Sequence, residues 1–453
     1  MKIHLIAIGG SAMHNMAIAL KNKGYEISGS DDEINEPSKS RLQHAGLLPK
    51  STGWFPEKIT EDLNAVIVGM HARTDNPELH KAKALGLKIF SYPEYIYEQS
   101  KNKLRIVIGG SHGKTTITSM ILHVLRYYKK DFDYLVGAQL KGFDTMVRLT
   151  ENAPVIIIEG DEYLSSPIDP RPKFHLYHPN IALISGIAWD HINVFPTFEN
   201  YVDQFKKFIE LVTPNGELIF CEKDEVLSEL TKNTTCQGKK ISYTLPKHLI
   251  ENGITYLIHD GGKFPLRIFG EHNLMNLEGA GKVCEALGIS KTKYYKAMES
   301  FEGASKRLEI VKHANEFNFY KDFAHSPSKL KATISAVKKQ FPERKLTAAI
   351  ELHTFSSLNE NFLGEYKNTM IEAEEAIVYF NPHTIEHKKL KAITEEQVRE
   401  NFGKHPDLKI YTNSSELVIY LQQQKWKNKN LLMMSSGNFD GINFGDFAKL
   451  LVV

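Results

Sequence analysis

The sequence has little cysteine and almost no net charge. Its three cysteines, Cys221, Cys236 and Cys284, are scattered among 453 residues without a Cys-x-x-Cys pair. This spacing fits a reducing compartment and argues against a disulfide framework or a cysteine zinc site. A formal net charge of +2 supplies no global basic field for nucleic acid, so local groups must hold any anionic ligand.

Long apolar runs are also missing. No run approaches the roughly 18 residues that a membrane-spanning helix requires, and the opening MKIHLIAIGG has neither the apolar core nor the cleavage site of a signal peptide. We therefore expect a cytoplasmic protein that binds small molecules, without membrane insertion and without nucleic acid. With 42% hydrophobic and 24% charged residues, the composition is typical of globular domains, and the length predicts about three of them.

A phosphate-binding loop is predicted for residues 106–125, IVIGGSHGKTTITSMILHVL. An apolar, β-branched run ends in two glycines, a tight turn follows, and an apolar helical pattern then begins. Backbone N–H groups and the dipole at such a helix N-terminus attract an anion. Lys114 would hold the β- and γ-phosphates of a nucleotide, and Thr115 would bind Mg²⁺. The glycines are shifted from the common pattern, so a chance Gly-Lys-Thr turn is the alternative.

A second nucleotide site is predicted near the N-terminus. Residues 2–31 show the pattern of a strand, a helix and a second strand, with Gly9 after the first strand and Asp31 at the end of the second. The acid lies roughly 20 residues after the glycine, the usual distance for a partner of a ribose hydroxyl. The next glycine of the dinucleotide fingerprint is replaced by Ser11, which favours another nucleotide over a nicotinamide. His71 follows a further strand, where a polar loop residue is an equally good interpretation.

Polar residues follow two buried-type strands of the central region. The strand that starts near residue 153 runs into Glu159, Asp161 and Glu162. Acids at the carboxyl end of a strand, on a sheet with a phosphate loop, suit Mg²⁺, with an ordinary acidic turn as the alternative. The strand from residue 181 ends in Asp190-His191, where the pair favours a functional histidine over a structural one.

The pattern becomes β-rich between residues 236 and 270, with a hairpin turn at Asp260-Gly261-Gly262. We expect this stretch to decorate the central sheet. A helix then carries Asn273 and Asn276 in its first turn, on one face. Asparagine can read a base edge because it donates and accepts, but helix capping explains one asparagine equally well.

The strand and helix alternation predicts an α/β protein of three domains. A charged linker at 101–105 and the stretch GASKRLEIV at 303–311 place the boundaries at 1–103, 104–306 and 307–453. The first and third domains are expected to be Rossmann-like, and the central one to be a P-loop ATPase-type domain. In the third, Asp322, His325 and His353 follow strands, where ligands gather in open α/β sheets.

Several motifs agree in order and spacing with one family. They are GSHGKTT (110–116), EGDE (159–162), DH (190–191), GEHNLMN (270–276), KRLE (306–309), DFAHSP (322–327), and, near the N-terminus, AIGGSAM (7–13) and GSD (29–31). On these motifs the chain resembles the Mur ligases, the ATP-dependent, amide-forming enzymes of peptidoglycan synthesis. The resemblance covers essentially the whole chain.

The resemblance implies a role for each domain. The first would bind a UDP-sugar, the second ATP and the third an amine substrate. ATP would phosphorylate the muramic acid carboxylate of the UDP-sugar, and the amine would then attack the resulting acyl phosphate. Because the ATP contacts would come from two domains, closure of the third domain is expected to be needed for turnover.

The implied site residues follow from the same motifs. The residues expected to act in catalysis are Lys114, Glu159, His191 and Arg307. Thr115 and Glu159 are expected to bind one Mg²⁺. Glu159 and His191 are candidates for binding a second ion. The expected ATP contacts are Gly110, Ser111, His112, Gly113, Lys114, Thr115, Thr116, Asn273, Asn276, Arg307, Asp322 and His325. The expected UDP-sugar contacts are Gly9, Gly10, Ser11, Ala12, Met13, Asp31 and His71.

The resemblance also bears on the substrates. His112 points to the branch that uses UDP-N-acetylmuramic acid directly, and Phe205 stands where other branches have a carbamylated lysine. WDHINVF, RLE, DFAHSP and MSSGNFDG look closer to a recycling ligase that attaches the peptide L-Ala-γ-D-Glu-diaminopimelate than to a ligase that adds L-alanine. The chain departs from the family at Ala12, Gly160 and Ser326, and its stretch 351–362, ELHTFSSLNENF, lacks the usual arginine.

Three readings from other classes use only part of the chain. A nicotinamide oxidoreductase would rely on the N-terminal glycine loop, where fingerprint glycines are missing. A P-loop kinase or regulatory NTPase would leave the first and third domains without a role. A non-enzymatic nucleotide sensor would give no role to His191 or to the acids at 159–162. An amide ligase accounts for all of these features.

Overall fold

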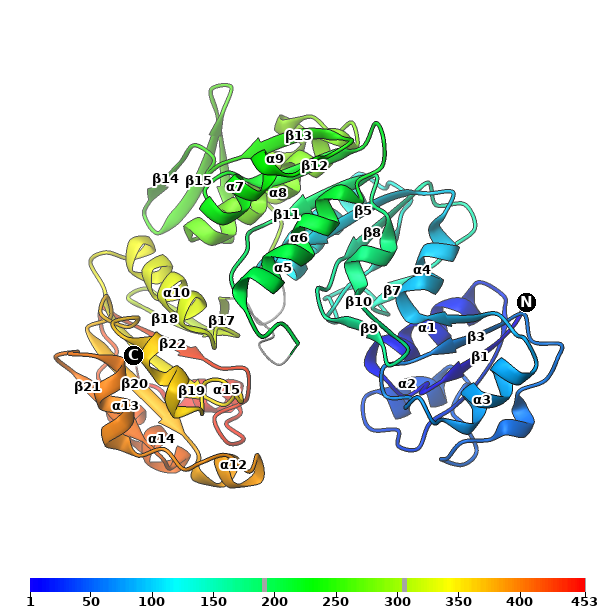
Figure 1. Ribbon diagram of the computed structural model, residues 1–453. Coiled ribbons are helices and arrows are strands. Elements are labelled where there is room, and N and C mark those ends of the chain that lie inside the picture. Colours follow the sequence, from blue (N-terminus) through cyan, green and yellow to red (C-terminus); the bar gives the residue numbers. More distant parts are fainter. Residues whose placement is uncertain (190–193, 304–307, 453) are drawn as a thin grey trace. The chain divides into compact units, whose positions relative to one another are not determined.

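The computed structural model describes residues 1–189, 194–303 and 308–452 (Figure 1). The chain divides into two compact units. The first comprises Met1–Leu245 and Met275–Met298, and the second Pro246–Leu274 and Glu299–Val453. Within the described ranges, no helix has both the length and the apolar character needed to cross a membrane.

The first unit opens with a four-stranded parallel sheet. Its strands are β1 (Lys2–Ile6), β2 (Glu26–Ser30), β3 (Ala65–Val68) and β4 (Ile89–Ser91), in the order β2-β1-β3-β4. Its helices are α1 (Ser11–Asn22), α2 (Ser38–His44), η1 (Pro56–Lys58), α3 (Pro77–Ala84) and α4 (Tyr92–Ser100). Strand β3 is buried along its whole length, as expected for a parallel strand covered on both faces. The predicted strand, helix and strand of residues 2–31 are confirmed.

A seven-stranded sheet forms the rest of the first unit. Its strands are β5 (Leu104–Gly109), β6 (Asp133–Leu135), β7 (Val147–Arg148), β8 (Val155–Glu159), β11 (Ile181–Ile184), β12 (Glu217–Cys221) and β13 (Lys239–Tyr243). They run in the order β13-β12-β11-β5-β8-β6-β7, all parallel except β7. The central place of β5 puts the predicted phosphate loop at the middle of the carboxyl edge, where open α/β sheets bind ligands.

Several helices and one hairpin accompany this sheet. They are α5 (Lys114–Tyr127), η2 (Lys173–Tyr177), α6 (Phe198–Glu210), α7 (Glu225–Asn233), α9 (Lys291–Met298) and the hairpin of β9 (Leu164–Ser166) and β10 (Asp169–Pro172). Helix α8 (Glu271–Ala286) contains the boundary between the two units, which falls after Leu274.

The second unit begins with a small antiparallel sheet of β14 (His248–Glu251), β15 (Ile254–His259) and β16 (Gly262–Leu266). The predicted hairpin is confirmed, but the expectation that it decorates the central sheet is wrong. The strands form a sheet of their own, held to the second unit by Gln340. This side chain accepts from Thr255 Oγ1 at 2.8 Å and donates to the Gly253 carbonyl at 2.6 Å, a contact that sequence spacing does not reveal.

A six-stranded sheet forms the core of the second unit. Its strands are β17 (Glu309–Ala314), β18 (Phe317–Asp322), β19 (Lys345–Leu352), β20 (Glu375–Phe380), β21 (Leu408–Tyr411) and β22 (Lys429–Met434), in the order β17-β18-β22-β19-β20-β21. Its helices are α10 (Pro327–Gln340), α11 (Glu360–Leu363), η3 (Gly364–Tyr366), α12 (Pro382–His387), α13 (Glu395–Phe402), α14 (Ser414–Gln422) and α15 (Phe444–Leu450). Only β17 is antiparallel to its neighbour.

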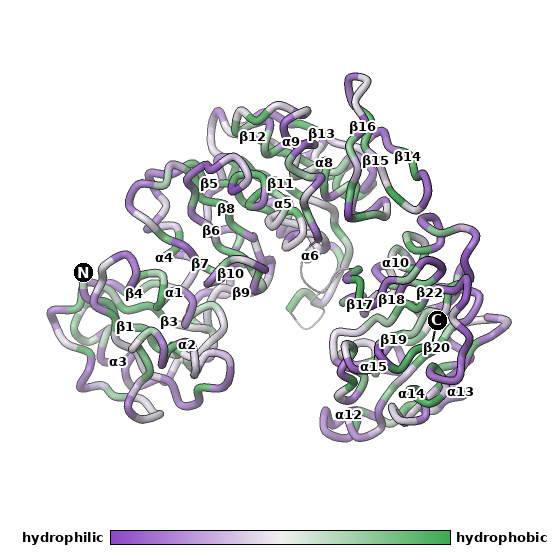
Figure 2. Tube along the Cα trace, turned by 180° about the vertical axis from the view of Figure 1, so that it is seen from behind, coloured by the Kyte–Doolittle hydropathy of each residue, from purple (hydrophilic) through white to green (hydrophobic). Residues whose placement is uncertain are grey.

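Two apolar cores cover the faces of this sheet. One contains Leu330 and Ile334 of α10 with Phe402 of α13, and the other contains Leu417 of α14 with Phe447 of α15. Hydrophobic residues follow the strands and polar residues the exposed loops (Figure 2). The predicted α/β class with Rossmann-like sheets is confirmed, while the boundaries at residues 103 and 306 stay a prediction.

A buried ion cluster lies where β20 begins. The Glu375 carboxylate accepts from Thr347 Oγ1 at 2.6 Å and pairs with Lys429 at 3.1 Å and Lys409 at 3.0 Å. Burial alone would raise the pKa of Glu375, but hydrogen bonds from Thr347 and Tyr420 and the two ammonium groups lower it to about 2. A depressed pKa makes this carboxylate a source of stability at neutral pH.

We expect Glu375→Gln to destabilise the second unit in a pH-dependent way. The pKa falls from its ordinary value of 4.5 to about 2, which corresponds to about 3 kcal/mol at neutral pH. This contribution is complete above the unfolded pKa and is lost as the pH falls toward the folded one. The difference from wild type should therefore shrink between pH 5 and pH 2. Urea unfolding followed by the fluorescence of buried Trp426, in a background with Trp54→Phe and Trp189→Phe, measures it.

Glu360→Gln is the matched control, because Glu360 pairs with Lys391 in an exposed position where solvent screens the interaction. A gap between wild type and Glu375→Gln that is the same at pH 7 and pH 3 would contradict the assignment.

Candidate active site

The phosphate loop connects β5 to α5 through two glycines in left-handed conformations. Gly110 has φ 124° and Gly113, which precedes the helix, has φ 81°. A Cβ atom at Gly110 would collide with Ser185 Oγ, and one at Gly113 with Asn276 Oδ1. Only glycine suits both positions, so the loop brings its backbone N–H groups and the start of α5 to one place. This is the predicted anion-binding arrangement.

Lys114 lies inside a group of carboxylates. Its Nζ donates to the Gly110 carbonyl at 2.7 Å and pairs with Glu162 at 2.6 Å. Burial by itself would lower the pKa of Lys114, but the charges of Glu162, Asp161 and Glu159 outweigh it and raise the pKa. The lysine therefore stays protonated, as a phosphate-binding cation must.

Thr115 and Glu159 meet as predicted. Thr115 Oγ1 donates to Glu159 Oε1 at 2.7 Å, and the Gly137 amide donates to Glu159 Oε2 at 2.8 Å. Burial raises the pKa of Glu159, opposed by these two hydrogen bonds. A hydroxyl and a carboxylate oxygen side by side are the hard donors that Mg²⁺ prefers. The donor set fits this ion.

The three acids at the carboxyl end of β8 do not act as one cluster. Glu159 faces Thr115, Glu162 faces Lys114, and Asp161 pairs with Lys173 at 2.5 Å on the partly exposed side. In the described part of the chain, no group of three or more His, Cys, Asp and Glu side chains is arranged to hold a metal. Of these acids, Glu159 is the one placed beside the predicted metal-binding threonine.

The inner side of the loop contains a network that the sequence does not reveal. Ser111 Oγ lies 2.8 Å from the Tyr201 hydroxyl and accepts from the Ala188 amide at 2.9 Å. The Tyr201 hydroxyl donates to Glu162 Oε1 at 3.2 Å. The His112 ring bonds the Ser111 carbonyl at 2.7 Å. Glu162, although visible in the acidic motif, had no predicted link to Lys114, and Tyr201 had no predicted role.

The two asparagines of α8 have different surroundings. Asn276 lies against Gly113 of the phosphate loop. Asn273, in the second unit, donates from Nδ2 to the Phe269 carbonyl at 2.9 Å, a local bond at the start of the helix. Thr116 is buried within α5.

The N-terminal glycine loop and Asp31 meet as their spacing predicts. The Gly9 amide donates to Asp31 Oδ2 at 2.7 Å. Burial raises the pKa of Asp31, opposed by the amides of Gly9 and Glu33. Gly10 directly precedes α1, whose first turn holds Ser11, Ala12 and Met13. His71 is exposed in the loop that follows β3, at the same carboxyl edge.

The second unit positions its predicted residues at the carboxyl end of β18. Asp322 accepts from the amides of Leu308 at 2.7 Å and Ala324 at 2.6 Å. The His325 ring bonds the Phe323 carbonyl at 2.7 Å, and Tyr366 donates to the His325 carbonyl. Ser326 precedes α10 without a side-chain capping bond. His191 and Arg307 lie outside the described residues.

A further contact joins two stretches at the carboxyl ends of β19 and β22. Glu351 accepts from Ser435 Oγ and from the Phe439 amide at 2.8 Å. Its carboxylate lies 3.6 Å from the His353 ring. The stretch 351–362, which lacks the family arginine, is thereby tied to MSSGNFDG at 434–441.

Family models match two stretches of the chain. Residues 2–103 match the domain described as "Mur ligase family, catalytic domain", and residues 108–284 match the "Mur ligase middle domain". A relative from Clostridium tetani, named UDP-N-acetylmuramate–L-alanine ligase, is 31% identical over 81% of each chain.

Two solved structures share the fold over essentially the full length. One is a murein peptide ligase from Psychrobacter arcticus, with a TM-score of 0.63, 20% identity and coverage of 100% of this chain and 99% of the other. The second is a UDP-N-acetylmuramate-alanine ligase from Thermotoga maritima, with a TM-score of 0.69, 21% identity and coverage of 99% and 98%. Together with the sequence matches, they lead to one conclusion: this chain belongs to the Mur ligase family of ATP-dependent ligases that form C–N bonds.

Proposed function

We propose that the chain joins the carboxylate of UDP-N-acetylmuramic acid to the peptide L-Ala-γ-D-Glu-meso-diaminopimelate, in the cytoplasm, as a step of peptidoglycan recycling. The observation that carries the ligase chemistry is the phosphate loop, with Lys114 among carboxylates and Thr115 on Glu159. His112 supports the muramate acceptor by resemblance. The peptide is supported by the resemblance of WDHINVF, RLE, DFAHSP and MSSGNFDG to the recycling branch.

Addition of L-alanine to the same acceptor is the second candidate. The 31% identity to a relative named as an L-alanine ligase favours it. Both reactions use the same acceptor and the same phosphoryl donor, and they differ only in the amine.

The chemistry requires activation of a poor electrophile. Transfer of the γ-phosphoryl group from ATP converts the carboxylate into an acyl phosphate. The amine nitrogen then attacks the carbonyl carbon, the new C–N bond forms, and the bond to phosphate breaks as the nitrogen loses its proton. Lys114 would neutralise the β- and γ-phosphates, while Thr115 and Glu159 would supply oxygen ligands to Mg²⁺. Such catalysis consists mostly of positioning and charge neutralisation.

The remaining roles rest on the resemblance. We propose that Asp31 and Gly9 to Met13, with His71, hold the UDP part, and that Gly110 to Thr116 hold the phosphates. We also propose that His191 binds a second Mg²⁺ together with Glu159 and that Arg307 contacts the γ-phosphate. Asp322 would contact the ribose, and His325 would line the ATP cleft. Asn273 and Asn276 would contact the adenine.

The amine decides between the two candidates. We expect phosphate release from ATP, Mg²⁺ and UDP-N-acetylmuramic acid to require the tripeptide, with L-alanine supporting little release. Colorimetric phosphate assay of the purified protein, with mass spectrometry of the UDP-product, measures this. Release with L-alanine alone would establish the second candidate, and release that needs neither amine nor UDP-sugar would contradict a ligase.

Lys114→Ala should lower kcat by at least about a hundredfold, because it removes the cation that neutralises the transferring phosphoryl group. Lys130→Ala is a matched control, since Lys130 is exposed beyond the far end of α5. Binding of UDP-N-acetylmuramic acid, measured by calorimetry, should be unchanged in both variants. Near-normal turnover of Lys114→Ala would refute the assignment of the phosphate loop.

A further inference from the structure

The connection between β6 and β7, residues 136–146, contacts the predicted metal ligand Glu159 through its backbone. We refer to it as the β6–β7 loop. Its Gly137 amide donates to Glu159 Oε2 at 2.8 Å, while Thr115 holds the other oxygen of the same carboxylate. A Cβ atom at Gly137 would lie 2.7 Å from Glu159 Oε1. The loop therefore approaches the carboxylate as closely as a backbone can.

Residues of the N-terminal sheet region hold the other end of this loop. Arg41 of α2 donates from one nitrogen to Gln139 Oε1 at 2.5 Å and to the Asp144 carbonyl at 3.1 Å. Asn15 of α1 accepts from the Met146 amide at 2.9 Å and from Arg41 at 3.2 Å. The bonds from Arg41 and Asn15 to the loop span more than 90 positions in the sequence, so α1 and α2 hold the loop in its place.

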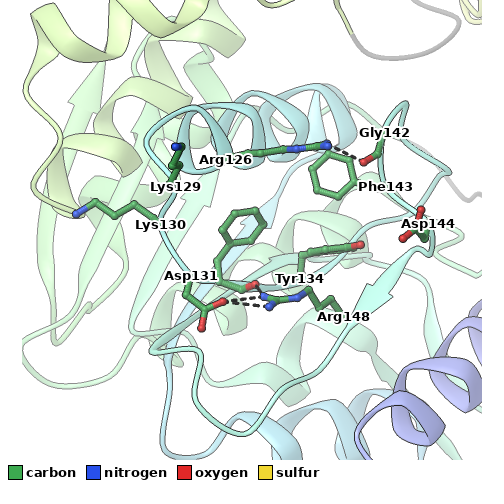
Figure 3. Close-up of a pocket in the computed structure, with 10 residues that line it drawn as sticks. Arg126, Lys129, Lys130, Asp131, Tyr134, Gly142, Phe143, Asp144 and Arg148 are labelled. Carbon is green, nitrogen blue, oxygen red and sulfur yellow. Dashed lines mark hydrogen bonds and ion pairs between the residues drawn. The ribbon is translucent and has the colours of Figure 1, made fainter.

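A third contact comes from the far end of α5 (Figure 3). Arg126 donates to the Gly142 carbonyl at 2.7 Å, with its guanidinium over the Phe143 ring at 5.2 Å. All three residues line a surface pocket of about 400 Å³. Arg148 lines the same pocket but pairs with Asp131 at 3.0 Å, outside the loop. The pocket thus offers one arginine that holds the loop and one that does not.

The N-terminal contacts also reach the glycine loop. Asn15 Nδ2 donates to the Ser11 carbonyl at 2.8 Å. Its neighbour His14 bonds the Gly10 carbonyl at 2.9 Å. Hydrogen bonds therefore tie Asn15 both to the start of α1 and to Met146 of the β6–β7 loop, and the backbone of that loop leads to the Gly137 amide that bonds Glu159.

We infer that Arg41 and Asn15 are positioning residues for the metal site, acting through the β6–β7 loop and Gly137 on Glu159. The inference rests on the proposed role of Glu159 as a Mg²⁺ ligand and extends it. Partners of a metal ligand commonly set metal affinity through its orientation. Here the partners come from the region proposed to bind the other nucleotide, which makes the metal site depend on it.

Binding of the fluorescent ATP analogue mant-ATP to the full chain tests this without any UDP-sugar or amine. The measured quantity is the Mg²⁺ concentration that gives half-maximal Mg²⁺-dependent binding. We expect Gly137→Ala to raise it about tenfold, the lower end of the range for partners of metal ligands, and Arg41→Gln and Arg126→Gln to raise it several-fold. Binding measured in EDTA should stay at the wild-type level, because Lys114 and the loop amides are untouched.

Arg148→Gln is the matched control and should retain the wild-type Mg²⁺ requirement. Wild-type behaviour of Arg41→Gln, or an equal change in Arg148→Gln, would overturn the inference. The inference would also be overturned if Arg41→Gln weakened binding of UDP-N-acetylmuramic acid, measured by calorimetry, and left the Mg²⁺ requirement unchanged. Arg41 would then be a direct ligand of the sugar nucleotide. Glu159→Gln separates the two proposals: if it leaves the Mg²⁺ requirement unchanged, the metal assignment itself fails. The identity of the amine does not enter any arm.

Discussion

The Glu159 carboxylate holds two loops of the first unit in position. It is half-buried at the end of β8, and burial raises its pKa, so an ionised group there needs donors. Thr115 supplies one from the phosphate loop and Gly137 supplies the other from the β6–β7 loop. Two segments that are distant in sequence are thus fixed by opposite oxygens of one side chain. Displacing either donor changes the orientation of a proposed metal ligand.

Lys114 faces a related problem of buried charge. An ammonium away from water is unfavourable unless a carboxylate compensates it, and Glu162 does so at 2.6 Å while Tyr201 holds its second oxygen. A triphosphate at the loop would bring a stronger set of anions to the same lysine, so Glu162 would then compete with it. The network of Ser111, Tyr201 and Glu162 therefore holds the Lys114 ammonium in place.

The sequence predicts the local parts of the site and, because ligands gather at the carboxyl edge of a parallel sheet, it also predicts that Thr115 and Glu159 lie together although they are 44 positions apart. Two glycines between a β-branched run and a helical pattern indicate the phosphate loop, because only glycine adopts its left-handed turns. Asp31 and Gly9 follow from the spacing of one strand-helix-strand unit. The contacts of Glu162, Tyr201 and Arg41 were missed because they join residues 48, 90 and 98 positions apart. No periodicity records such pairs, since the packing of whole elements creates them. The β-rich stretch before α8 was misplaced for the same reason, as its partner Gln340 lies 85 positions away.

The phosphate loop does not distinguish between the two candidate amines. Both candidate reactions make the same demands of Lys114, Thr115 and Glu159, so selection has to arise elsewhere in the chain. The stretch 351–362, which lacks the arginine expected from the resemblance, is joined through Glu351 to Ser435 and Phe439. The latter residues belong to the MSSGNFDG stretch, one of the motifs on which the proposed peptide substrate rests. Because residues in one hydrogen-bonded network couple energetically, we expect the effects of substitutions in 351–362 and in 434–441 on the amine preference to be non-additive.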